Sequence, residues 1–210
     1  MIELKDVNKS YGGRKIIDMF SADIDKGDFI AITGESGNGK TTLLNLMGLL
    51  EKPDEGYVAV DGIKSPNNKQ KLIMQRNLFG YIFQNYALIE DETVEVNLRI
   101  SLEYRKGINK SDEIDNALSY VGLDGFKKKK IYELSGGEQQ RIALARVFLK
   151  KCDYIFADEP TGNLDKKNRD LVFEILKGLN NEGKAIIFAT HDLELAGKAN
   201  RSFVVHGNQF

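Results

Sequence analysis

The feature that most constrains this chain is an apolar run that leads directly into a glycine-rich loop. The run is Phe29–Thr33, FIAIT, and the loop is Gly34–Thr41, GESGNGKT. An almost wholly apolar strand is typical of a parallel sheet that is covered on both faces. The loop fits the G-x-x-x-x-G-K-[ST] phosphate-binding pattern without a mismatch, and leucines at helical spacing follow it. The segment therefore predicts a phosphate site at the edge of an α/β sheet.

The residues of this loop have distinct roles in binding a nucleoside triphosphate. Its glycines let successive backbone N–H groups turn inward around phosphate oxygens. We expect Lys40 to reach the β and γ phosphates and the Thr41 hydroxyl to ligate Mg²⁺. The predicted phosphate ligands are the loop residues and their neighbour: Gly34, Glu35, Ser36, Gly37, Asn38, Gly39, Lys40, Thr41 and Thr42.

A pair of acids follows a second apolar run, Tyr154–Glu159, YIFADE. The buried strand places Asp158 and Glu159 together at its C-terminal end, where ligands bind in open α/β sheets. Acid pairs at strand ends are often only solvated turn residues, but the phosphate loop favours a catalytic interpretation. Asp158 then holds Mg²⁺ through water. Glu159 acts as general base on a water that attacks the γ phosphate.

The two histidines of the chain have different contexts. His191 directly follows the apolar run 185–190, AIIFAT, and so also lies at the C-terminal edge of the sheet. From there it is placed to touch the γ phosphate and the attacking water. His206 has no such context, and we expect it to be structural.

A second glycine turn lies about a hundred residues beyond the first. Leu134–Arg146, LSGGEQQRIALAR, reads as a tight turn that runs into an amphipathic helix. A helix N-terminus with exposed N–H groups is suited to holding an anion. The chain thus has two candidate phosphate-binding turns, and its function depends on how they are used.

Strand and helix patterns alternate along most of the chain, which predicts an α/β fold with a parallel sheet. Short strands at Ile2–Val7 and Ser21–Ile24 suit an antiparallel edge sheet, and the helical pattern of 91–130 suggests an insertion. We expect one domain, 1–210, with a core at about 1–88 and 146–210 and a helical subdomain at about 89–145. Other expected elements are helices from Thr41 to about Leu50, up to about Lys150 and at Lys166–Leu179, and strands at Phe79–Gln84, 154–157 and 185–190.

Composition limits the classes of partner. Thirty Lys and Arg side chains face 31 Asp and Glu, so no global basic field attracts nucleic acid. No signal peptide is recognisable, and no stretch approaches the roughly 20 apolar residues of a membrane helix. We therefore expect a soluble, cytoplasmic protein that reaches a membrane only through a partner.

Two further features have ordinary explanations. Cys152 is the single cysteine and borders an apolar run, which favours a packed thiol in a reducing compartment. The run Lys127–Lys130 reads as a solvated loop, with contact to a partner or a lipid head group as the alternative.

These motifs together resemble the nucleotide-binding subunit of an ABC transporter, over essentially the whole chain. The matching residues, in order, are Tyr11 for adenine stacking, Gly34–Thr41 as Walker A, Gln84 as the Q-loop glutamine, Leu134–Gln139 as the family signature, Asp158 and Glu159 as Walker B and catalytic base, Gly162–Asp165 as the D-loop, and His191 as the H-loop. Asn38 and Glu138 stand where the family often has other small polar residues, and neither departure weakens the resemblance.

The resemblance implies a P-loop NTPase (RecA-like) core that binds ATP and Mg²⁺, with Thr41, Gln84 and Asp158 at the metal. It also implies that two chains meet head to tail, so that the signature turn of one closes over the γ phosphate held by the other. The residues of that turn are Ser135, Gly136, Gly137 and Glu138. This trans arrangement answers why the chain has two phosphate-binding turns.

The resemblance also implies separate integral membrane permease subunits, with this chain peripheral on the inner face of the membrane. The form of the segment 160–165, PTGNLD, resembles the subgroup for lipoprotein release, for macrolide and antimicrobial-peptide export, and for cell division. We favour export, with the ATPase of a non-transporting, force-transmitting complex as the alternative. Soluble cassette proteins of translation or repair fit less well, because the chain has one cassette, and P-loop kinases have no use for LSGGEQ.

Overall fold

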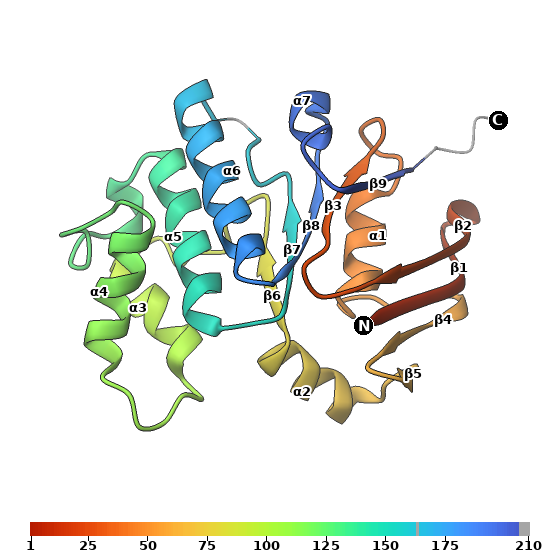
Figure 1. Ribbon diagram of the computed structural model, residues 1–210, viewed down its shortest axis with the longest axis horizontal. Helices are drawn as coiled ribbons and strands as arrows, with labels where there is room; N and C mark the ends of the chain where they lie inside the picture. Colours follow the sequence, from red (N-terminus) through yellow and green to blue (C-terminus); the bar gives the residue numbers. More distant parts are fainter. Residues whose placement is uncertain (163, 206–210) are drawn as a thin grey trace.

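In a computed structural model, which describes residues 1–162 and 164–205, the strands form two sheets (Figure 1). The antiparallel sheet has the order β2-β1-β4-β5 and the parallel sheet the order β6-β7-β8-β3-β9. The antiparallel strands are β1 Ile2–Tyr11, β2 Arg14–Ile24, β4 Glu55–Val60 and β5 Ile63–Lys64. The parallel strands are β3 Phe29–Thr33, β6 Phe79–Ile82, β7 Tyr154–Asp158, β8 Ala185–Ala189 and β9 Arg201–Val204.

Helices cover both faces of the parallel sheet. Helix α1 (Lys40–Met47) lies between the two sheets, while α5 (Gly136–Lys150) and α6 (Lys166–Asn181) cover the opposite face (Figure 1). A separate helical lobe packs on α5. It contains α3 Val94–Arg99, η1 Ile100–Leu102, α4 Lys110–Tyr120 and η2 Ile131–Glu133, and the remaining helices are α2 Asn68–Asn77 and α7 Leu193–Ala196.

Strand β3 shows why the parallel sheet has apolar runs rather than alternating ones. Ile30 and Ile32 join the core cluster that contains α1, whereas Phe29 and Ala31 join the cluster that contains α5 and α6. Every residue of β3 is buried because each face of the strand has its own hydrophobic layer. The expected α/β fold with a parallel sheet and an antiparallel edge sheet is confirmed.

Some expected boundaries were wrong. Helix α1 ends at Met47 instead of Leu50, because Gly48 caps it and Leu49 has a left-handed φ of 57°. Strand β2 begins at Arg14 instead of Ser21, since the two glycines after Tyr11 both have positive φ and form a tight hairpin turn. Strand β6 stops at Ile82, two residues before the expected end.

The lysine run is less solvated than expected. The ammonium of Lys127 donates to the hydroxyl and carbonyl of Ser111 and pairs with Asp115 at 2.8 Å. It therefore fastens the loop to the start of α4, and only the three lysines after it are exposed. Cys152 is fully buried, as expected, and burial raises the pKa of its thiol to about 11.

Two remaining expectations concern histidine and the membrane. His206 lies outside the described residues. In the part of the chain that is described, no helix combines the length and the apolar character required to cross a bilayer.

A substitution at Gly80 tests how tightly α5 packs on β6. A Cβ at this position would lie 2.6 Å from Cys152 Sγ and 2.9 Å from Val147 Cγ1. We expect Gly80→Ala to lower the free energy of unfolding by about 1–3 kcal/mol in urea titrations, because the core must expand. Gly197→Ala is the control, since its Cβ meets nothing closer than 3.4 Å. Equal stability of the two variants would contradict this packing.

Candidate active site

The phosphate loop opens into a cavity of about 430 Å³ at the C-terminal edge of the parallel sheet. The strands β7, β8 and β3 are adjacent, so the segments that follow them converge there. The lining residues are Tyr11, Ile16, Ser36, Gly37, Gly39, Lys40, Thr41, Thr42, Gln84, Asp158 and Glu159. Ten of the predicted phosphate, adenine, metal and catalytic residues thus share one cavity, and Ile16 is the one lining residue that was not predicted.

The loop follows a path that side chains would obstruct. Gly34 has a φ of 142°, and a Cβ there would lie 2.4 Å from the carbonyl oxygen of Val205. A Cβ at Gly39 would lie 2.4 Å from Ile16 Cγ2. The contact with Ile16 was missed from the sequence, because nothing in the apolar pattern of β2 indicates which residue supports the loop.

Lys40 begins α1 and is only 8% exposed. Its ammonium donates to the carbonyl oxygens of Gly34 at 2.8 Å and Glu35 at 3.1 Å. An ammonium has three N–H donors, so one is left for an anion at the mouth of the loop. The buried charge is therefore placed where the sequence predicts β and γ phosphates.

Thr41 and Asp158 are 117 residues apart in sequence and meet in this cavity. The Thr41 hydroxyl donates to Asp158 Oδ2 at 2.9 Å. Burial raises the pKa of Asp158, the nearby charge of Glu159 adds to the rise, and the Thr41 hydrogen bond opposes it. A cation at this carboxylate would relieve the cost of burying its charge.

The donor set around Asp158 suits Mg²⁺. A hydroxyl, a carboxylate and the amide of Gln84 all line the cavity, and Mg²⁺ prefers oxygen ligands. Among the described residues no three His, Cys, Asp or Glu side chains gather as a metal cage.

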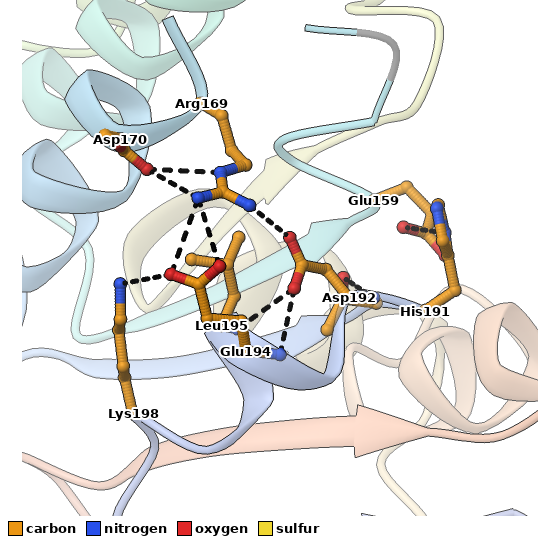
Figure 2. A network of polar contacts seen from close by, with 9 residues as sticks. Glu159, Arg169, Asp170, His191, Asp192, Glu194, Leu195 and Lys198 are labelled. Atoms are coloured by element: carbon orange, nitrogen blue, oxygen red, sulfur yellow. Dashed lines mark hydrogen bonds and ion pairs between the residues drawn. The ribbon is translucent and has the colours of Figure 1, made fainter. Parts of the chain in front are cut away.

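Glu159 is held in an unusual conformation beside His191. Its φ of 45° is left-handed, which is uncommon for a residue with a long side chain and marks a candidate functional position. Its buried Oε2 lies 3.0 Å from His191 Nδ1, without hydrogen-bond geometry to any donor among the described residues (Figure 2). A carboxylate oxygen without a donor keeps its capacity to accept a proton from water.

His191 itself is the more exposed partner. Its side chain is 69% exposed, compared with 14% for Glu159. It does not line the cavity but lies at the rim through its contact with Glu159. The imidazole is thus beside the predicted general base and open toward the surface.

Tyr11 offers an exposed ring at the other side of the cavity. The ring is 48% exposed, and its hydroxyl donates to the Glu51 carboxylate. Burial and the Glu51 carboxylate raise the pKa of Tyr11. The tyrosine is thus held at its tip while its face remains available for stacking on a base.

The second glycine turn lies outside this cavity. Ser135 is exposed and caps α5: its hydroxyl receives the Glu138 N–H, and Glu138 Oε2 receives the Ser135 N–H at 2.8 Å. The N–H and the hydroxyl of Ser135 both donate to the Glu138 carboxylate and lower the pKa of Glu138. The S-x-x-E spacing is the sequence signal of such a capping box, so this role of Glu138 was predictable although the motif assignment passed over it.

Gly137 joins this turn to α6. A Cβ at Gly137 would lie 2.7 Å from Asn168 Cγ, so the glycine allows close packing of the two helices. Asn168 in turn donates to Asp165, the N-cap of α6. Position 163 of the predicted D-loop, 162–165, lies outside the described residues.

The comparisons with known proteins agree with this geometry. Residues 17–162 match the family model described as ABC transporter. The chain belongs to the ABC transporter family.

Curated relatives of this ABC chain include two named macrolide export ATP-binding/permease protein MacB. The one from Mannheimia succiniciproducens is 39% identical and the one from Neisseria meningitidis serogroup B is 38% identical, each over 96% of this chain. The chain spans about one third, 32%, of the length of each relative.

Solved structures show the same fold. The ATP-binding cassette MJ0796, in a dimeric post-hydrolysis state with ADP and Pi, matches with a TM-score of 0.90 and 33% identity over 99% of this chain and 95% of that one. CbiO1 from Clostridium perfringens matches with a TM-score of 0.87 and 26% identity, over 98% and 84% of the two chains. This ABC chain is therefore an ATP-binding ATPase cassette.

Lys40 tests the phosphate site. We expect Lys40→Ala to weaken the binding of a fluorescent ATP analogue by about tenfold or more, because a buried charge-assisted contact to phosphate is lost. Lys26→Ala is the matched control, since Lys26 pairs with Asp153 at the exposed surface. An unchanged affinity of the Lys40→Ala variant for the ATP analogue would contradict the Walker A assignment.

Proposed function

We propose that this ATPase works as a pair of identical chains that close head to tail on ATP and Mg²⁺. Each nucleotide then lies between the phosphate loop of one chain and the signature turn of the other. The observation that carries the proposal is the placement of Ser135 and Gly136: both are exposed at the start of a 15-residue helix, and neither lines the chain's own cavity.

The chemistry of that turn suits a phosphate brought by a second chain. The first N–H groups of a helix have no intrahelical partner, and the helix dipole adds partial positive charge there. The capping box of Ser135 and Glu138 uses the N–H groups of those two residues. Gly136 and Gly137 lie between them in the first turn of α5, where N–H groups without an intrahelical partner suit an incoming anion.

Hydrolysis in this arrangement uses the groups already in the cavity. When bound, Mg²⁺ neutralises charge on the β and γ phosphates, and Thr41, Asp158 and Gln84 would hold it. Glu159 takes the proton of the attacking water, and His191 contacts the γ phosphate at the rim. Loss of the γ phosphate removes the contacts between chains, so the pair opens.

The opening is proposed to drive a membrane partner in export. The support is that curated relatives carry the words export and permease in their names and are about three times as long as this chain. In this proposal the chain lies on the inner face of a membrane, bound to integral permease subunits. A non-transporting, force-transmitting complex uses the same ATPase steps, so the identity of the bound membrane protein distinguishes the two.

A second cavity of about 550 Å³ is the proposed docking site for that partner. It lies between α2, β6, η1 and α5, at the junction of the core and the helical lobe. Phe83 lines it and immediately precedes Gln84 of the nucleotide cavity. Exposed apolar side chains in its lining are Leu50, Leu72, Phe83, Ile100 and Tyr104.

Charge favours a cytoplasmic helix with an acidic side chain as the occupant. Arg76 stacks over the Tyr104 ring at 3.7 Å, and Lys150 donates to the Gln75 carbonyl at 2.6 Å. Burial lowers the pKa values of Arg146 and Lys150. In the described part of the chain neither pairs with a carboxylate, so an acid from a partner would relieve their buried charge.

Glu159→Gln tests the paired arrangement. We expect this variant to bind ATP and Mg²⁺ but not to hydrolyse it, so that a dimer accumulates on size exclusion with light scattering. Turnover should fall by at least about 100-fold, the contribution typical of a general base.

Ser135→Arg in the Glu159→Gln background is the matched control for the interface. The added side chain lies far from the chain's own cavity, so ATP binding should persist while the dimer disappears. A Glu159→Gln chain that stays monomeric with ATP, or a double variant that still dimerises, would contradict the shared site.

Crosslinking tests the docking site. We expect a photoreactive amino acid at Ile100 to yield adducts with the cytoplasmic segment of one integral membrane protein in cells. The same amino acid at Ile63, an exposed residue of β5 outside the second cavity, should yield none. Adducts formed with that membrane protein from Ile63 and not from Ile100 would place the partner elsewhere.

A further inference from the structure

A cluster of charged side chains lies beside the catalytic groups without touching the nucleotide cavity (Figure 2). Its centre is Arg169, in the first turn of α6, whose side chain is only 18% exposed. The guanidinium contacts Asp170 on its own helix, and Asp192 and Glu194 at the start of α7. This one side chain therefore joins the first turn of α6 to the start of α7.

The contact with Asp192 is the one that reaches toward the catalytic residues. Arg169 Nη1 donates to Asp192 Oδ2 at 3.0 Å, and Nη2 lies 3.3 Å from Glu194 Oε2. Asp170 accepts from the Nε and Nη2 groups at 3.1 and 3.0 Å but stays on α6. The planar guanidinium thus uses separate edges for the two helices, which a single ammonium cannot reproduce.

Asp192 organises the segment that carries His191. Its Oδ1 receives the N–H groups of Glu194 and Leu195 at 2.9 and 3.2 Å, and its own N–H donates to Thr190 Oγ1 at 3.0 Å. Thr190 is 1% exposed and continues β8. His191 is therefore held between two residues whose backbone is fixed by hydrogen bonds.

The imidazole has little packing of its own. With 69% of its side chain exposed, its position beside Glu159 depends on the backbone at 190–192 rather than on surrounding side chains. A shift of about 1 Å at a catalytic group can cost orders of magnitude in rate. Anything that anchors Asp192 consequently affects where the imidazole lies.

We propose that Arg169 is a positioning residue for ATP hydrolysis, which holds the His191 segment against the first turn of α6 through Asp192. The inference rests on the proposed role of His191 at the γ phosphate. The same turn of α6 contacts the signature turn through Asn168 and Gly137. Arg169 thus fixes the histidine relative to the helix that supports the phosphate-binding turn offered to the second chain.

Steady-state hydrolysis and nucleotide binding test this role. Arg169→Met keeps an unbranched stem and removes the guanidinium with its charge, and we expect kcat to fall about tenfold through misplacement of the imidazole. The Kd for ATP should change by less than about twofold, because this partly exposed pair lies outside the cavity. Arg169→Lys keeps one charged contact and should recover part of kcat.

Asp170→Asn is the matched control. It removes a carboxylate partner of the same guanidinium but leaves the bridge to Asp192, so kcat should match that of the unmodified chain. The double variant Arg169→Met/Asp192→Asn should be no slower than the slower single variant, since both act through one contact. Asn at 192 retains the cap of α7.

The histidine resonances supply a direct readout. The chain has two histidines, so ¹³C-histidine labelling gives two Cε1–H signals, and His206→Gln assigns them. The His191 signal should move in Arg169→Met and Asp192→Asn and stay in place in Asp170→Asn. A role in overall stability alone would not produce this pattern.

Other results would overturn the proposal. These are normal kcat in Arg169→Met, an unmoved His191 signal, or parallel losses of kcat and ATP affinity. If Arg169→Met does not fold, Arg169→Lys and Asp192→Asn decide by the same measurements. Should His191→Ala retain hydrolysis, the proposed role of His191 fails; should it abolish hydrolysis while Arg169→Met is normal, only the role of Arg169 fails.

Discussion

The hydrogen bond between the Thr41 hydroxyl and Asp158 is the contact on which the rest of the site depends. It joins the helix after the phosphate loop to the end of β7, and it can form only because β8 pairs with both β3 and β7. The three strands are covered by apolar layers on both faces apart from the half-buried end at Asp158. A rigid, dry sheet thereby fixes the polar groups at its edge with little freedom to move.

Several site residues were predictable because each lies in the segment that follows a buried strand. Glu159 comes after β7 and His191 after β8, while the glycine-loop motif after β3 identified Lys40 and Thr41. Parallel strands end on the same side of a sheet, so the order of the apolar runs indicates where the site lies. The boundaries of α1 and β2 were not predictable in the same way, because they depend on left-handed residues whose φ the apolar pattern does not report.

Contacts between elements were not predictable from any local pattern. Ile16 supports the phosphate loop, Asn168 packs on Gly137 and Arg169 bridges to Asp192, and each pair is joined only by the packing of whole helices and strands. Lys127 was expected to lie in a solvated loop, and its ammonium instead binds Ser111 and Asp115 of α4. Long polar side chains serve such bridges because they can span from one element to another while their stems remain packed.

Burial differs between the two glycine turns in a way that suits the different roles proposed for them. Lys40 is buried and bonded to its own loop, so the first turn is complete within one chain. Ser135 and Gly136 are exposed, and only the outer N–H groups of their turn are taken by the capping box. A turn completed by its own chain would lose those donors to internal partners, whereas a turn that binds the nucleotide of a second chain must keep them free and rigid. The capping box fixes the helix end and Gly137 packs it against α6. In the proposed pair of chains this rigid helix end would be preorganised for the phosphate bound by the second chain.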